Sequence, residues 1–96
     1  MTRAHVLAQL HALLPQLAEL GVRRLALFGS LARDEASATS DIDVLVDIVG
    51  PRPFAQRLAV TDLLEAHFGC HVDVVPFDAL KPRARAIVER EALLVA

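Results

Sequence analysis

Two aspartates at alternating positions, Asp41 and Asp43, are the residues of this 96-residue chain whose spacing best fits chemistry. They alternate with the apolar Ile42 and Val44, as in a strand with one polar and one apolar face. Two like charges on one face repel and raise each other's pKa, and a bound divalent cation removes that cost. Because carboxylate oxygens are the natural ligands of Mg²⁺, the pair predicts a metal site.

A third carboxylate, Asp73, stands in a segment that alternates in the same way. Its neighbours Val72 and Val74 fall on the opposite face of the expected strand. If the two strands are adjacent, Asp73 lies beside Asp41 and Asp43. Three carboxylates on adjacent strands can hold two metal ions about 3.5–4 Å apart, the arrangement used for in-line nucleotidyl transfer. Asp73 would then face the metal nearest the attacking hydroxyl and could also accept its proton.

A glycine–serine pair after an apolar run predicts a phosphate site. Gly29 allows the backbone to come close to a ligand. Ser30 offers a hydroxyl and is expected to open a short helix over residues 30–34, whose free N–H groups favour an anion. Arg33, one helical turn later, either contacts a phosphate or is an ordinary surface charge. We expect a nucleoside triphosphate to bind at this turn while its metal ions bind the aspartates.

Hydropathy patterns predict the elements that must position these residues. Apolar residues recur at three- and four-residue spacing in three expected helices, over residues 2–20, 54–68 and 82–91. Pro15 should kink or divide the first of them. Leu58 belongs to the apolar side expected for the second helix, and Ala84, Ile87 and Val88 are expected on the buried side of the third. Strands are expected over residues 23–28, 41–49 and 70–75, with a brief strand or a helical turn over 92–96.

The lengths of the connections predict how the strands pair. Twelve residues separate Phe28 from Asp41, which is short for a parallel crossover and favours antiparallel pairing of the first two strands. Twenty residues, including a full helix, separate Val49 from Cys70 and allow a right-handed parallel crossover. The predicted fold class is therefore α/β, with a small mixed β-sheet and flanking helices.

Composition bounds the function further. With 54% hydrophobic residues the chain can bury one small core, so residues 1–96 are expected to form a single domain. A net charge of −2 argues against direct DNA binding through a basic surface. The single cysteine, Cys70, excludes an internal disulfide and a cysteine-based zinc cluster. No apolar run approaches the roughly 18 residues of a membrane span. No secretion signal is evident, so we expect a cytoplasmic location without membrane association.

The glycine–serine turn and the first two carboxylates together resemble a known signature. The sequence LFGSLAR over residues 27–33, followed by SDIDVLV over residues 40–46, is similar to the nucleotidyltransferase motif of the DNA polymerase β superfamily. More closely, it resembles the minimal nucleotidyltransferases, whose pattern is Gly-Ser, Asp-x-Asp and a third acid on a later strand. The resemblance covers residues 22–88. One departure is Asp34, where relatives usually carry glycine, and its charge falls near the expected triphosphate.

The resemblance implies an activity and a partner. Minimal nucleotidyltransferases are commonly antitoxins that transfer AMP from ATP to a tyrosine of a HEPN-type toxin, using Mg²⁺, and they bind that toxin directly. Carried over to this sequence, Gly29 and Ser30 would bind the nucleotide phosphates, with Arg33 beside them. The metal ligands and catalytic residues would be Asp41, Asp43 and Asp73. The chain contains no tyrosine, so an acceptor tyrosine must lie on another molecule.

Two alternatives to a catalytic antitoxin stay open. Asp34 favours a catalytically weak or inactive module that neutralises its partner by forming a complex. Transfer to a small molecule fits the length of the chain less well, because such enzymes generally carry an additional substrate domain. The leucine-rich first helix and the tail Leu93–Val95 fit either a homo-oligomer surface or burial in the core, so the oligomeric state is also open.

Overall fold

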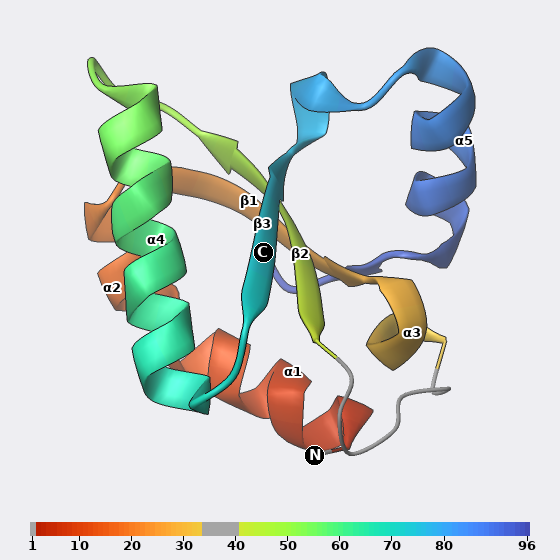
Figure 1. The fold of residues 1–96 in the computed structure, drawn as a ribbon, viewed down its shortest axis with the longest axis horizontal. Helices are drawn as coiled ribbons and strands as arrows, with labels where there is room; N and C mark the ends of the chain where they lie inside the picture. The colour runs from red at the N-terminus through yellow and green to blue at the C-terminus, as the bar shows by residue number, and fades with distance from the viewer. Residues whose placement is uncertain (1, 34–40) are drawn as a thin grey trace.

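A four-stranded mixed β-sheet is the centre of the fold, and its strand order is β3-β2-β1-β4 (Figure 1). The computed structural model describes residues 2–33 and 41–96. The strands are β1 (Val22–Phe28), β2 (Ile42–Ile48), β3 (Val72–Pro76) and β4 (Leu93–Leu94). The helices are α1 (Arg3–Ala12), α2 (Leu14–Glu19), α3 (Gly29–Ala32), α4 (Pro53–Phe68), the 3₁₀ helix η1 (Phe77–Ala79) and α5 (Pro82–Glu91). The predicted α/β class with a small mixed sheet is confirmed.

Strand directions follow the connection lengths. β1 pairs antiparallel with β2, as the short connection predicts, and antiparallel with β4 at its other edge. β2 pairs in parallel with β3, and the connection between them carries the 16-residue α4. Gly69, with a φ of 69°, ends α4 before the chain enters β3. These pairings bring the end of β1 and the starts of β2 and β3 to one end of the sheet.

Pro15 divides the N-terminal helical segment, as predicted. α1 ends at Ala12 and α2 begins at Leu14, so Pro15 lies in the first turn of α2. A backbone N–H in that turn has no partner within the helix, so proline costs no helical hydrogen bond there. Thr2 caps α1, because its Oγ1 accepts a hydrogen bond from the His5 backbone N–H at 3.1 Å.

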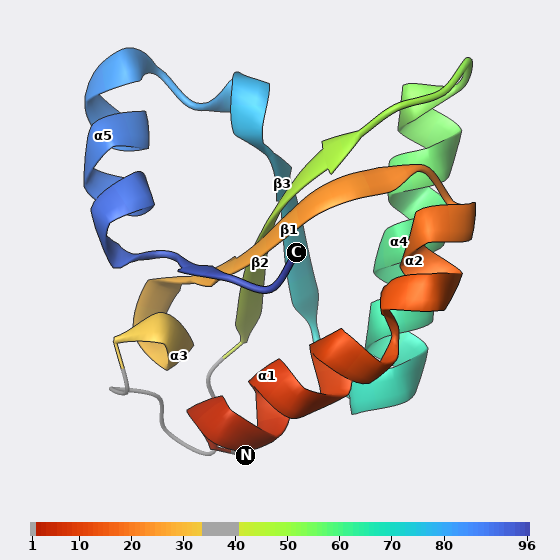
Figure 2. The ribbon, with the colours of Figure 1, turned by 180° about the vertical axis from the view of Figure 1, so that it is seen from behind.

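The C-terminal tail forms a strand, not a helical turn. β4 runs along the edge of β1 that β2 does not occupy (Figure 2). The Val95 N–H donates to the Leu25 carbonyl at 2.8 Å, and the Leu25 N–H donates to the Ala96 carbonyl at 3.1 Å. Leu93 and Val95 pack against the main core. Of the two interpretations of the tail, burial in the core is therefore the one that fits these two residues. The tail therefore covers one edge of the sheet.

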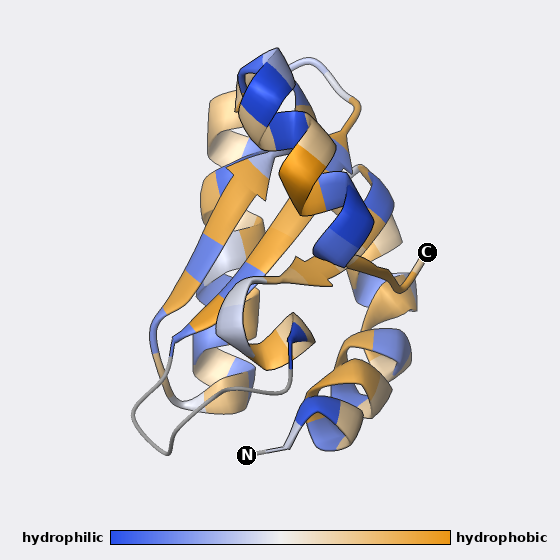
Figure 3. Ribbon diagram, turned by 90° about the vertical axis from the view of Figure 1, so that its right-hand side faces the viewer, coloured by the Kyte–Doolittle hydropathy of each residue, from blue (hydrophilic) through white to orange (hydrophobic). Residues whose placement is uncertain are grey.

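Helices cover the two faces of the sheet unequally. The main core contains buried side chains from α1, α2, α3 and α4 that pack with those of the sheet. Figure 1 shows the ribbons of these helices around the strands. The fully buried β2 residues in this core are Ile42, Val44 and Val46, as their alternation predicts. A smaller cluster on the other face contains Ala26, Leu45 and Phe77, with Val88 of α5 packed against it. Figure 3 shows the strands as mainly hydrophobic and α5 as mainly hydrophilic. No helix within residues 2–33 and 41–96 is long and apolar enough to span a membrane.

Three positions expected to be buried, Leu58, Ala84 and Ile87, are exposed, so the prediction for them is wrong. Leu58 is 64% exposed, because α4 turns Val60 and Leu64 toward the sheet. Two residues correspond to about 200° of helical rotation, which places Leu58 on the side away from Val60. Ile87 is 45% exposed, because α5 buries no residue fully and meets the smaller cluster through Val88.

Burial predicts different outcomes for two leucines of α4. Leu64→Ala removes a side chain that is 0% exposed, and we expect it to lower the free energy of unfolding by about 2–5 kcal/mol. Leu58→Ala is the control on the same helix, with an expected change within about 0.5 kcal/mol. Equilibrium urea unfolding measures both variants. Equal losses would contradict the orientation of α4.

Candidate active site

The parallel register of β2 and β3 places two of the predicted carboxylates side by side. Asp43 and Asp73 are direct partners across the two strands. Paired residues of a sheet direct their side chains to the same face, so the two carboxylates are neighbours. Asp41 lies one residue before β2 and is exposed, as is Asp73. The expected adjacency of the second and third strands, and with it of Asp43 and Asp73, is confirmed.

The glycine–serine turn lies directly against Asp43. β1 ends at Phe28, whose partner across the antiparallel pair is Asp43, and Gly29 follows with a φ of 75°. A Cβ atom at Gly29 would overlap Asp43 Oδ2 and would lie 3.1 Å from Asp43 Cγ. The close approach therefore requires a residue without a side chain. The turn and the carboxylates face each other as expected, although α3 begins at Gly29, one residue before the predicted start at Ser30.

Like-charge repulsion is concentrated at Asp43. Its pKa is raised above the ordinary value, first by burial and then by the carboxylates of Asp73 and Asp41. His71 and Arg33 act in the opposite direction and lower this pKa. The three predicted carboxylates therefore interact within one small region. A cation bound among them would relieve their repulsion.

Arg33 lies at the end of α3, where it contacts α5. Its exposed guanidinium donates from Nη1 to Glu91 Oε2 at 3.2 Å. Because Arg33 also lowers the pKa of Asp43, its charge reaches the carboxylates. The two residues of the ion pair are 58 positions apart, and no motif or spacing in the sequence predicts their contact. Asp34, the departure from the family pattern, lies outside the described residues.

Two nearby polar residues, His71 and Asp47, have partners of their own. His71 Nδ1 lies 3.1 Å from Glu65 Oε2, which also accepts a hydrogen bond from the Val72 N–H at 3.0 Å. Glu65 thus joins the end of α4 to the start of β3, a role with no signal in the sequence. Asp47 lies at the other end of β2, where the Arg23 Nε donates to its Oδ2 at 3.1 Å. These pairings favour structural roles for both residues.

The carboxylates fit a metal ion that is held jointly with a nucleotide. Among residues 2–33 and 41–96, no three carboxylate, imidazole or thiol side chains form a ready metal site by themselves. Mg²⁺ in nucleotide sites usually takes one or two carboxylates, with waters and phosphate oxygens as its other ligands. Asp43 and Asp73, adjacent and accessible to solvent, with Asp41 nearby, supply that kind of donor set.

Comparisons with known proteins assign this arrangement to a family. The nucleotidyltransferase domain family matches residues 10–95, nearly the whole chain. This chain belongs to that family. Protein adenylyltransferase MntA of Thermococcus cleftensis is 37% identical over 75 residues, which are 78% of this chain and 76% of that protein. A Methanocaldococcus jannaschii protein assigned as a protein adenylyltransferase is 33% identical over 81 residues, which are 84% of this chain and 87% of that protein.

Solved structures agree with the family and the fold. A structure assigned as a minimal nucleotidyltransferase matches with a TM-score of 0.85 and 36% identity, covering 97% of this chain and 95% of that chain. A toxin–antitoxin crystal structure with AMP-PNP matches with a TM-score of 0.67 at 16% identity. That match covers 90% of this chain and 72% of that chain, and it shows a shared fold. The resemblance based on Gly-Ser and Asp-x-Asp is confirmed for the family, the fold and the nucleotidyltransferase class of enzyme.

Gly29 and Gly69 form a matched pair for testing the contact with Asp43. Both have a positive φ, 75° and 69°, but a Cβ at Gly69 would meet nothing within 4 Å. Alanine at either position therefore costs backbone strain of about 1–2 kcal/mol. Gly29→Ala also pushes against the Asp43 carboxylate, so we expect a larger loss of stability and an ATP affinity at least about tenfold lower. Urea unfolding and calorimetric ATP titration measure these changes, and equal effects at both glycines would contradict the contact.

The raised pKa of Asp43 predicts how stability depends on pH. The folded chain holds the Asp43 proton more tightly than the unfolded chain does. The resulting stabilisation is complete below the ordinary pKa of 3.8 and is lost as pH rises through the higher folded value. The Asp43→Asn variant has no carboxylate at this position and so does not lose this stabilisation as pH rises. Its free energy of unfolding minus that of the wild type should therefore increase from about pH 3 to about pH 7. Urea unfolding in EDTA measures the difference, and parallel curves would contradict the raised pKa of Asp43.

Proposed function

We propose that this nucleotidyltransferase is a Mg²⁺-dependent protein adenylyltransferase that moves AMP from ATP to a tyrosine of a HEPN-type toxin and so neutralises it. The proposal rests chiefly on the contact of Gly29 with Asp43, directly beside Asp73. That contact brings the expected phosphate site together with the expected metal ligands. A protein acceptor is supported by the two relatives described as protein adenylyltransferases.

A separate toxin molecule is supported as the acceptor by two further observations. This chain contains no tyrosine, so it cannot modify itself on that residue. Asp41 and Asp73 are exposed, which leaves the carboxylates accessible to a side chain of another protein. A structure that shares the fold is a toxin–antitoxin crystal structure with AMP-PNP. The HEPN class and the tyrosine target follow from the resemblance to minimal nucleotidyltransferases.

The residues of the glycine–serine turn would bind the nucleotide. Gly29 lets the backbone approach the triphosphate closely, and the Ser30 hydroxyl would donate a hydrogen bond to a phosphate oxygen. The Arg33 guanidinium, which donates a hydrogen bond to Glu91, would also donate to the phosphates. A triphosphate attracts it more strongly because it carries more negative charge than one carboxylate. Mg²⁺, when bound, would neutralise charge on the triphosphate and on the leaving pyrophosphate.

The carboxylates would position the reaction and accept its proton. Asp41 and Asp43 would hold the metal ion, and Asp73 would share this task from the adjacent strand. Asp73 would also accept the proton of the acceptor tyrosine as its oxygen forms a bond to the α-phosphorus. The bond between the α-phosphorus and the bridging oxygen breaks in line with this attack, and pyrophosphate leaves. A bound cation would offset the burial and the carboxylate repulsion that raise the pKa of Asp43.

Single Asp→Asn exchanges test the role of the carboxylates. Asp41→Asn, Asp43→Asn and Asp73→Asn keep the size of the side chain but remove its charge. Each is expected to lower the rate of labelled AMP transfer from ATP to the cognate toxin by at least about 100-fold. EDTA should have the same effect on the wild type. Asp47→Asn is the control, because Asp47 lies on the same strand but pairs with Arg23 at the far end.

Two results would count against the proposal. Equal labelling of the toxin by the wild type and by Asp43→Asn would remove the catalytic claim. Full neutralisation by the double variant Asp41→Asn/Asp43→Asn would show that complex formation suffices, as the binding-module alternative holds.

A further inference from the structure

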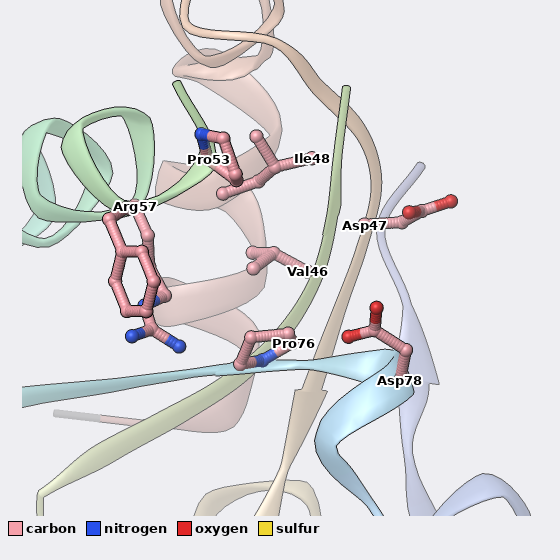
Figure 4. A pocket seen from close by; sticks show the side chains of 8 residues that line it. Val46, Asp47, Ile48, Pro53, Arg57, Pro76 and Asp78 are labelled. Carbon is pink, nitrogen blue, oxygen red and sulfur yellow. The ribbon is translucent and has the colours of Figure 1, made fainter. Parts of the chain in front are cut away.

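A hollow opens at the end of β2 opposite to the carboxylates. It has a volume of about 200 Å³ and lies between the ends of β2 and β3 and the first turns of α4 (Figure 4). Its apolar lining includes Val46, Ile48, Pro53 and Pro76. None of the residues assigned to nucleotide or metal binding contributes to it, so the hollow is separate from the candidate active site.

Exposed apolar side chains stand beside this hollow. Phe54, in the first turn of α4, lines it and is 77% exposed. Leu58, one helical turn later, is 64% exposed. A partner covering both would remove their apolar area from water, and aromatic side chains carry much of the energy of protein interfaces. We call the hollow together with Phe54 and Leu58 the α4 surface.

Opposite charges stand on two sides of the α4 surface. Arg57 lies on the α4 side, its guanidinium 5.3 Å from the centre of the Phe54 ring, and Asp78 lies on the η1 side (Figure 4). Asp47 also lines the hollow, but Arg23 already binds it. Neither Arg57 nor Asp78 forms an ion pair within the described part of the chain. Each side therefore presents a charge that those residues do not neutralise.

We propose that the α4 surface docks onto the same surface of a second copy of this chain. In a two-fold symmetric pair, every contact between two different residues occurs twice. An axis in the plane of the interface, between the two sides of the hollow, places Arg57 of each copy opposite Asp78 of the other. The same operation directs Phe54 of each copy toward the hollow of the other. The surface thus carries both halves of a complementary contact, which favours a second copy over an unrelated partner.

This pairing leaves the candidate active site open. β2 has seven residues, so at about 3.3 Å per residue its two ends lie roughly 20 Å apart. The α4 surface is thus remote from Asp43 and Asp73, and the inference is independent of the proposed function. The surface has far fewer residues than the roughly 20–30 on each side of a standard interface. We therefore expect a weak dimer, with a Kd in the micromolar range or above.

Sedimentation velocity over a wide range of concentrations tests the association. The wild type is expected to pass from monomer to dimer, and Phe54→Ser to raise the Kd at least about tenfold. Ile87→Ser is the control, because Ile87 is an exposed apolar residue of α5 that does not line the hollow. Circular dichroism verifies that the variants keep the wild-type fold. A wild-type chain that stays monomeric up to about 1 mM overturns the proposal.

Charge reversal tests whether the two copies meet as proposed. Arg57→Glu and Asp78→Arg each oppose like charges in a symmetric pair, so each variant alone should associate at least about tenfold more weakly. In an equimolar mixture of the two variants, every such contact joins opposite charges, and association should return toward the wild-type value. A mixture that associates no better than its components overturns the arrangement. Binding of an unrelated protein to the α4 surface, without association of two copies, would also overturn the proposal.

Discussion

Two like charges lie next to each other at Asp43 and Asp73, and the fold must hold them there. Partial burial, followed by this repulsion, raises the pKa of Asp43. The register that creates the contact is maintained from the opposite face of the sheet, where Ile42 and Val44 are fully buried. A slip of one residue would turn these apolar side chains to the other face. The core therefore enforces a contact between two carboxylates that is unfavourable in itself and that a bound cation would relieve.

The central strand β2 gives the molecule two ends with different properties. At its start, carboxylates and the glycine–serine turn form a polar, partly open region, joined to α5 by the Arg33–Glu91 ion pair. At its other end, an apolar hollow and Phe54 stand beside the first turns of α4. The middle of β2 is fully buried, so a rigid strand connects the two ends without any residue belonging to both. A substitution at one end of β2 therefore leaves the residues of the other end in place.

Short-range patterns in the sequence predicted most of the fold. Alternation placed Ile42 and Val44 in the core, and connection lengths predicted both strand directions correctly. Periodicity did not determine which apolar stripe of a helix faces the sheet, which is why Leu58 was misplaced. The contact of Arg33 with Glu91 depends on packing between distant segments, and no local pattern encodes it. Gly-Ser and Asp-x-Asp located the candidate site, whereas the roles of its residues stay predictions until they are tested.

The closeness of Gly29 to Asp43 has a consequence for how such chains evolve. Gly29 has two independent reasons to remain glycine, its φ of 75° and the carboxylate that occupies the place of a Cβ. If a descendant replaced Asp43 with a smaller residue, the second reason would vanish. Asparagine and aspartate tolerate a positive φ better than other residues with side chains, so they would become acceptable at position 29. While Asp43 remains, the glycine is constrained by both its backbone and its neighbour, so a change at position 43 is expected to precede a change at position 29.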